Sequence, residues 1–139
     1  MKQEMIPDVV IIDDDPLNNL LCHKIIELTM QNVVVNTFTI PEKGLEYIQS
    51  TCCSDTGGRD SLLFLDINMP SLTGWDVLEK IESFPDHIKD HMKIYMLSSS
   101  VNPCDKEKAD NNPLVSGYVV KPLSQVKLKA IFSDYLKSE

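Results

Sequence analysis

The chain has 139 residues, of which 42% are hydrophobic and 24% are charged, a composition typical of one folded domain with a buried core. The 13 Lys and Arg residues against 21 Asp and Glu give a formal net charge of −8, which argues against a large nucleic-acid interface, because such interfaces need clustered cations. No apolar stretch is long enough to span a membrane, and residues 1–8 lack the pattern of a signal peptide, so we expect a cytoplasmic protein.

Five short apolar runs alternate with amphipathic segments along the chain. The runs are continuous and mostly rich in β-branched residues, which favours strands buried on both faces of a parallel sheet. They lie at residues 9–12, 33–38, 62–65, 94–97 and 117–120.

The segments between these runs predict helices. Residues 16–30 form the first, and helical spacing puts five apolar residues on one face of it: Leu17, Leu20, Leu21, Ile25 and Leu28. Residues 41–51 and 75–84 form the second and third, and Trp75 is expected to anchor the third in the core or at its rim.

The last two predicted helices begin at residues that cap helices well. Asn102 followed by Pro103 predicts a short polar helix that ends near Asn111. Ser124 is expected to cap the final helix. The apolar positions of that helix are Val126, Leu128, Ile131, Phe132 and Tyr135.

Five strands alternating with five helices predict an α/β fold, a doubly wound parallel sheet in a single domain that spans residues 1–139. In such folds the functional residues gather beyond the carboxyl ends of the strands. Chemically active side chains do follow four of the five predicted strands directly. They are Asp13, Asp14 and Asp15, then Asp66, Ser98 and Lys121.

These side chains have the chemistry of phosphoryl transfer. Clustered carboxylates repel one another, and Mg²⁺ relieves the repulsion because it prefers oxygen ligands. Asp14 and Asp66 would be direct ligands, and Asp13 would bind directly or through water. The Asp66 carboxylate is also a possible nucleophile toward phosphorus. Lys121 would neutralise phosphoryl oxygens, and the Ser98 hydroxyl would donate a hydrogen bond to one of them.

Four sequence motifs, in this order, resemble the receiver domains of bacterial-type response regulators. They are IIDDDP at 11–16, LDINMP at 65–70 with Gly74, MLSS at 96–99 and VKP at 120–122. The resemblance covers nearly the whole chain. It implies a flavodoxin-like (βα)5 fold with five parallel strands in the order 2-1-3-4-5.

The resemblance also implies a role for each residue of the cluster. Asp66 matches the phosphoacceptor, and Asp13 and Asp14 match the acidic pair that binds Mg²⁺. Asn68 matches the position whose backbone carbonyl joins the metal. The phosphodonor implied is a histidine kinase or a histidine phosphotransfer protein.

Three further positions match the switch that follows phosphorylation. Ser98 matches the hydroxyl that turns toward the phosphoryl group, although the neighbouring Ser99 is the alternative if the register slips by one residue. Lys121 matches the lysine that pairs with the phosphoryl group. Tyr118 matches the aromatic residue that swings inward, although a half-buried strand tyrosine without a switch role is also common.

No output domain follows Glu139, so we expect the domain to act through contacts with an unknown protein effector, at the face formed by residues 102–136. The chain is either a stand-alone switch or a receiver excised from a larger protein. Residues 51–60 make the connection before the third strand longer than is usual. This segment would either contact a specific partner or have no function.

Two other classes of protein share part of this pattern. A Mg²⁺-dependent aspartyl phosphatase of the haloacid-dehalogenase type needs an acid/base aspartate where Asn68 stands, and it needs a cap domain, so we expect no enzyme. A pseudo-receiver without phosphorylation chemistry is disfavoured by the intact cluster. Asp15 is expected to cap the first helix.

The four cysteines follow no zinc or redox spacing, and the three histidines have no ligand spacing either. Reduced thiols are the expected state in a cytosolic protein. The cysteines are Cys22, Cys52, Cys53 and Cys104.

Overall fold

A computed structural model describes residues 8–30, 33–51, 61–99 and 101–136 of the chain. Its centre is a sheet of five parallel strands in the order β2-β1-β3-β4-β5, which confirms the predicted fold class and strand order. The strands are β1 (Asp8–Ile12), β2 (Val34–Phe38), β3 (Ser61–Asp66), β4 (Met92–Ser98) and β5 (Val115–Val120).

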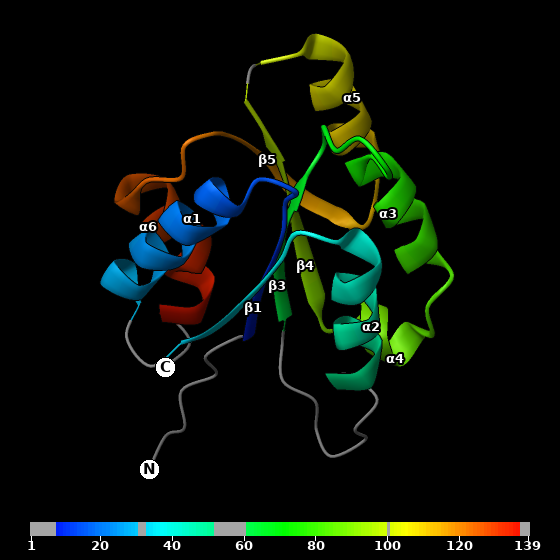
Figure 1. Cartoon of the computed structure of the whole chain (residues 1–139), viewed down its shortest axis with the longest axis horizontal. Helices are drawn as coiled ribbons and strands as arrows, with labels where there is room; N and C mark the ends of the chain where they lie inside the picture. Colours follow the sequence, from blue (N-terminus) through cyan, green and yellow to red (C-terminus); the bar gives the residue numbers. More distant parts are fainter. Residues whose placement is uncertain (1–7, 31–32, 52–60, 100, 137–139) are drawn as a thin grey trace.

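Helices cover both faces of this sheet (Figure 1). Helices α1 and α6 lie on one face, and α2, α3 and α5 lie on the other. The helices are α1 (Pro16–Thr29), α2 (Pro41–Thr51), α3 (Gly74–Glu82), α4 (Asp86–Lys89), α5 (Pro103–Asn111) and α6 (Gln125–Leu136). Each face has its own buried apolar cluster, so the sheet separates two cores.

The predicted burial on both faces applies to the middle of the sheet and not to its edges. Every residue of β1 and β3 is buried. The edge strands β2 and β5 contain half-buried and exposed positions, because each has a neighbouring strand on one side only. The buried central strands therefore place the residues that follow them at the carboxyl edge of the sheet.

Helix starts agree with the capping residues in the sequence. Asp15, Asn102 and Ser124 each accept a hydrogen bond from a backbone N–H in the first turn of the helix that follows. Helix α3 begins with a reciprocal capping box between Thr73 and Asp76, which was not predicted.

Helix α4 was not predicted, and it makes six described helices instead of five. It has four residues, too few to show a helical period in the sequence. Its Ile88 is 2% exposed and joins the apolar cluster on the α2 and α3 side, so tertiary burial stabilises this single turn.

The predicted apolar face of α1 was wrong. Four of its five positions are largely exposed: Leu17 by 62%, Leu20 by 53%, Leu21 by 57% and Leu28 by 72%. The opposite face, with Asn19, Cys22 and Ile26, packs on the sheet. The helix has apolar residues on both faces, and spacing alone does not distinguish the face that meets the sheet.

The predicted apolar positions of α6 are only partly buried. Val126 of α6 is 80% exposed, although Leu128 and Phe132 of the same helix are fully buried. Residues 52–60, which hold most of the lengthened connection and two of the cysteines, lie outside the described residues. None of the helices in the described ranges has both the length and the hydropathy of a membrane span.

Candidate functional site

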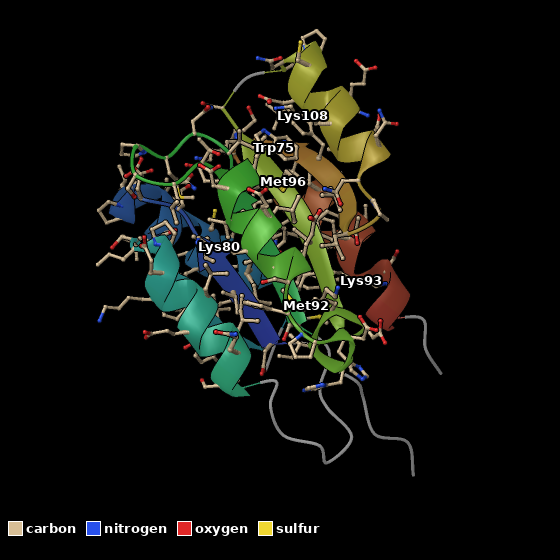
Figure 2. The ribbon with its side chains drawn as sticks, turned by 90° about the vertical axis from the view of Figure 1, so that its right-hand side faces the viewer. Trp75, Lys80, Met92, Lys93, Met96 and Lys108 are labelled. Atoms are coloured by element: carbon tan, nitrogen blue, oxygen red, sulfur yellow. The ribbon has the colours of Figure 1, made fainter. Side chains whose placement is uncertain are left out.

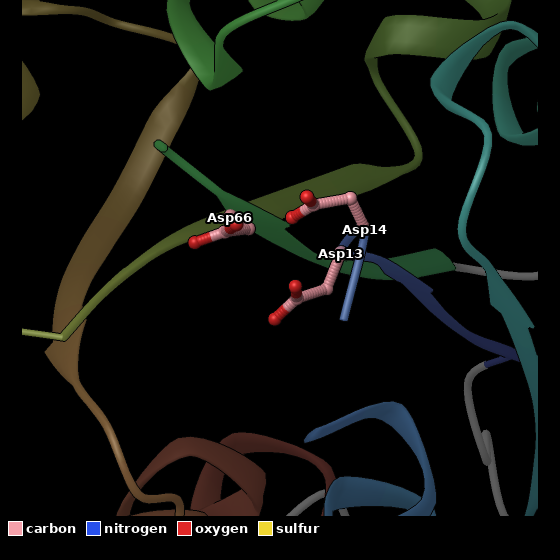
Figure 3. A group of neighbouring side chains, drawn as sticks. All are labelled: Asp13, Asp14 and Asp66. Carbon is pink, nitrogen blue, oxygen red and sulfur yellow. The ribbon is translucent and has the colours of Figure 1, made fainter. Parts of the chain in front are cut away.

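Three carboxylates meet at the carboxyl ends of β1 and β3. The two strands are paired neighbours in register, with Ile12 opposite Leu65, so the residues after them emerge side by side. Asp13 and Asp14 follow β1, and Asp66 is the last residue of β3. One oxygen from each carboxylate lies within 4.8 Å of the others, and Figure 3 shows the three side chains together. The predicted convergence is therefore present in the fold.

Lys121 completes the cluster from the end of β5. Its Nζ lies 2.8 Å from Asp13 Oδ2 and 3.1 Å from Asp66 Oδ1, so one ammonium bridges both carboxylates. Its backbone N–H donates to the carbonyl oxygen of Ser98 at 2.7 Å, which fixes it beside the end of β4. The peptide bond from Lys121 to Pro122 is cis.

Burial and mutual repulsion make the ionised form of this cluster unfavourable. Asp66 is 3% exposed, and burial, followed by the charge of Asp13, raises its pKa to about 6 against the opposing effect of Lys121. Burial lowers the pKa of Lys121, but its hydrogen bond to Asp13 and the two carboxylate charges outweigh burial and raise it. The site therefore has more negative charge than one lysine compensates.

This donor set fits a magnesium ion. Asp13, Asp14 and Asp66 offer only hard oxygen ligands. Burial, and then the charge of Asp13, raise the pKa of Asp66, and a divalent cation would favour the ionised carboxylate against both effects. Asp14 is exposed, whereas Asp13 and Asp66 are buried, so the cluster is open to solvent on one side. The open side leaves room for the water molecules that Mg²⁺ usually keeps.

Two asparagines on the first turn of α1 hold Asp13 in place, and neither was predicted as a site residue. The Asn18 side-chain amide donates to Asp13 Oδ2 at 2.7 Å, and the Asn19 amide donates to the Asp13 carbonyl oxygen at 2.9 Å. The backbone N–H of Asp15 donates to Asp13 Oδ1 at 3.0 Å. Uncharged side chains gave no signal of their own, but their place one turn after the acidic triplet could have identified them.

Asp15 has the role expected of it. Its Oδ1 accepts the backbone N–H of Leu17 at 3.0 Å, so its carboxylate caps α1. It does not belong to the cluster of carboxylates that could share a metal ion in the described residues.

The three remaining predicted residues lie on β4, on β5 and in the loop after β3. Ser98, the last residue of β4, is 1% exposed, whereas Ser99 is exposed, which favours Ser98 as the buried hydroxyl. Tyr118 on β5 is half-buried, and its hydroxyl accepts the backbone N–H of Asn102 at 3.4 Å. Asn68 lies in the loop after β3 with an exposed side chain.

Gly74 lets the loop after β3 close against Asp66. Its N–H donates to the carbonyl oxygen of Ile67 at 2.9 Å. A Cβ at this position would lie 2.6 Å from the carbonyl oxygen of Asp66, far inside van der Waals contact. A side chain here would displace the backbone that carries Asp66.

Of the four cysteines, the structure describes two, and both are free thiols. Cys22 is a buried residue of α1, and burial, followed by the charge of Asp13, raises the pKa of its thiol to about 11. Cys104 is exposed on α5. Cys52 and Cys53 lie outside the described residues.

Comparisons with known proteins agree with this architecture. A model of the response regulator receiver domain matches residues 9–133. A two-component response regulator from Cytophaga hutchinsonii is 28% identical, with a TM-score of 0.84 over 96% of this chain and 98% of that one. A receiver protein from Dyadobacter fermentans is 22% identical, with a TM-score of 0.82 over 94% and 98% of the two chains.

A receiver domain protein from Clostridium thermocellum is 21% identical, with a TM-score of 0.74 over 94% of both chains, which supports the fold alone. None of the curated proteins compared with this sequence matches it.

Proposed function

Because the chain belongs to the response regulator receiver domains, the phosphoacceptor modules of two-component systems, we propose that Asp66 accepts the phosphoryl group. The observation that carries this assignment is the position of Asp66. It is buried at the end of the central strand β3, with Lys121 Nζ at 3.1 Å and two further carboxylates beside it. Among the described residues, this cluster is where three carboxylates come close enough to share a metal ion.

We propose a phosphohistidine as the donor. The transfer breaks the bond between phosphorus and the imidazole nitrogen, forms a bond between phosphorus and an Asp66 oxygen, and leaves the imidazole free to take up a proton. Asp66 must be ionised to attack, and its pKa of about 6 permits this at neutral pH. Bound Mg²⁺, held by Asp13, Asp14, Asp66 and the carbonyl of Asn68, would supply positive charge to the phosphoryl oxygens.

Lys121 and Ser98 would then respond to the new group. Lys121 bridges Asp13 and Asp66 in the present state. A phosphoryl group on Asp66 offers this ammonium stronger acceptors, and the buried hydroxyl of Ser98 is a second donor near the same strand ends. Tyr118 follows on the adjacent strand, and its hydroxyl is already in contact with the start of α5. This path leads from the site to the face formed by residues 102–136, where we place the contact with an effector protein.

The exposed leucines of α1 support a protein as the phosphodonor. Leu17, Leu20, Leu21 and Leu28 lie on the face of α1 that turns away from the sheet, and Leu17 is three residues from Asp14. Covering a leucine side chain contributes about 1.5 to 3 kcal/mol, so a helix laid on this face would gain substantial binding energy. A histidine kinase or a histidine phosphotransfer protein docked there would reach the open edge of the site.

Receiver domains act as signalling switches, and we propose that this chain likewise performs no enzymatic turnover of a small substrate. A single domain over residues 1–139 and a cytoplasmic location stay predictions.

The intact mass of the protein after incubation with a small phosphodonor, with and without Mg²⁺, tests the assignment. We expect one added phosphoryl group, dependent on Mg²⁺, that is absent from Asp66→Asn. Asp15→Asn is the matched control, because it removes a neighbouring carboxylate that caps α1. Undiminished labelling of Asp66→Asn, or labelling without Mg²⁺, would contradict the proposal.

A second comparison tests the docking face. Leu20→Ser combined with Leu21→Ser should slow transfer from a phosphorylated histidine phosphotransfer protein at least about tenfold, the equivalent of about 1.4 kcal/mol. The same variant should accept phosphate from a small phosphodonor at the normal rate, because neither residue lies in the acidic cluster. Equal rates with the protein donor would place the docking surface elsewhere.

A further inference from the structure

A groove of about 680 Å³ lies between α3 and α5, apart from the acidic site. Figure 2 shows its position from two labelled residues, with Trp75 near the start of α3 and Lys108 above it on α5. No residue of the phosphorylation cluster lines it. Its lining residues include Trp75, Leu78, Glu79, Glu82, Glu107 and Lys108.

Trp75 forms an aromatic surface at this groove. The indole is half-buried, and its Nε1–H donates to Asp105 Oδ1 at 3.1 Å, which ties the first turn of α3 to α5. Lys108 Nζ lies 5.3 Å from the centre of the ring, within the range of a cation–π contact. The hydrogen bond to Asp105 therefore holds the ring in place, and the ammonium of Lys108 already lies over its face.

The charge of the groove is negative. Glu79, Glu82 and Glu107 are exposed on its walls, and Lys108 is the cation among the residues that line it. The whole chain has a formal net charge of −8. A second copy of this chain or a nucleic acid would bring further negative charge to these walls, whereas a basic segment would be attracted.

We propose that this groove binds a basic segment of a partner protein, with an arginine stacked on Trp75. The guanidinium is planar and stacks on aromatic faces better than an ammonium does, so it replaces Lys108 over the indole. The three glutamates supply the complementary charge for flanking Lys and Arg residues. This interaction surface goes beyond the phosphoacceptor function and does not depend on it.

Trp75 provides the signal for a binding test, because it is the only tryptophan in the chain. The probe is a helix-forming peptide of about 15 residues composed of Arg, Lys and Leu, a length at which such a helix is stable enough to form on binding. We expect a saturable change in Trp75 fluorescence with this peptide and none with a counterpart that has Glu in place of Arg and Lys. Absence of a saturable change with the basic peptide overturns the proposal.

Matched charge reversals distinguish groove binding from general attraction to an acidic protein. Glu79→Lys with Glu107→Lys should weaken binding about tenfold or more. Glu42→Lys with Glu46→Lys makes the same change in net charge at exposed positions of α2 and should have a much smaller effect. If the two double variants weaken binding equally, the attraction is non-specific and the groove is not the site.

A further variant should strengthen binding, so its result cannot be explained by a loss of folding. Lys108→Ala should tighten binding several-fold, because it vacates the face of Trp75 that the arginine takes. Lys106→Ala is the control on the same helix, where the lysine pairs with Asp110 outside the groove. Weaker binding by Lys108→Ala, or an equal gain from both variants, contradicts the stacking.

The exposed thiol of Cys104 locates the bound peptide. Cys104 lines the groove, so saturating peptide should slow its alkylation at least several-fold, as measured by mass spectrometry of the digested protein. An unchanged alkylation rate under saturating peptide would place the peptide elsewhere on the surface.

Discussion

The acidic site at the strand ends and the groove between α3 and α5 contain the same ingredients, several carboxylates and one lysine, in different surroundings. In the site, Asp13 and Asp66 are buried, and Lys121 contacts both at 2.8 and 3.1 Å. In the groove, the glutamates are exposed, and Lys108 lies over an indole instead of a carboxylate.

The difference between these regions is mainly one of dielectric. Two unit charges 4 Å apart interact by about 4 kcal/mol at the effective dielectric constant of a protein and by about 1 kcal/mol in bulk water. Single substitutions in the buried site should therefore have large effects on stability, and single substitutions in the groove should have small ones. The groove would bind through the sum of weak attractions, which suits reversible docking. The acidic site instead keeps closely spaced charges buried, where each interaction is stronger.

Removing Lys121 should have the largest effect. Lys121→Met leaves Asp13 and Asp66 buried side by side without a cation, and we expect the free energy of unfolding of the metal-free protein to fall by about 3 kcal/mol at pH 8. Lys108→Met in the groove removes the same charge and should change it by less than about 1 kcal/mol. Urea unfolding measures both, and equal losses would remove the distinction between the two regions.

Replacing Asp66 should stabilise the metal-free protein. The pKa of this carboxyl rises from 3.8 to about 6 on folding, so at pH 7 the folded protein holds a charge that its surroundings disfavour. Asp66→Asn removes that charge and should raise the free energy of unfolding by at most about 3 kcal/mol, at about 1.4 kcal/mol for each pKa unit.

The stability that Asp66→Asn gains should increase with pH. Between pH 3.8 and about 6 the folded protein binds the proton that the unfolded chain has lost, so the contribution of Asp66 to stability falls as pH rises and is lowest above pH 6. The advantage of Asp66→Asn should therefore shrink as pH falls from 7 toward 4. Glu79→Gln in the groove is the control, and a gain from Asp66→Asn that is constant over this range would contradict the burial argument.

Mg²⁺ should stabilise the protein through the site alone. At a concentration ten times its dissociation constant, a ligand specific for the folded state adds about 1.4 kcal/mol, which should appear as a higher melting temperature. The increase should be largely lost in Asp13→Asn. Glu79→Gln combined with Glu82→Gln should keep it, because exposed carboxylates in the groove bind the ion weakly. Equal loss in both variants would show general charge screening instead.

The smallest effect is expected at the bridge across the groove. Asp105→Ala removes the acceptor of the Trp75 Nε1–H bond and should lower stability by about 1 kcal/mol. The emission of Trp75 should shift as well, because its indole loses a fixed partner. Asp110→Ala, which breaks an exposed pair with Lys106 on the same helix, should leave the emission unchanged.

Much of the site could be predicted from the sequence. Asp13, Asp66 and Lys121 stand directly after three apolar runs, and parallel strands bring their carboxyl ends to one edge, so the order of residues was sufficient to expect their convergence. The caps at Asp15 and Asn102 were equally visible, because capping depends on local hydrogen bonds between near neighbours in the chain.

What the sequence determined by itself was local: the strands, the capped helix starts and the chemically active residues at the strand ends. The tertiary structure decided which face of α1 meets the sheet, that Asn18 and Asn19 hold Asp13, and that Trp75 lines a groove with α5. The groove depends on contact between segments far apart in the chain, and the orientation of α1 depends on which of two similar faces is buried. The asparagine contacts span only five and six residues, but they form only because that orientation turns both side chains toward Asp13. Spacing records the period of a helix, but the free energy of packing against the rest of the fold selects its orientation.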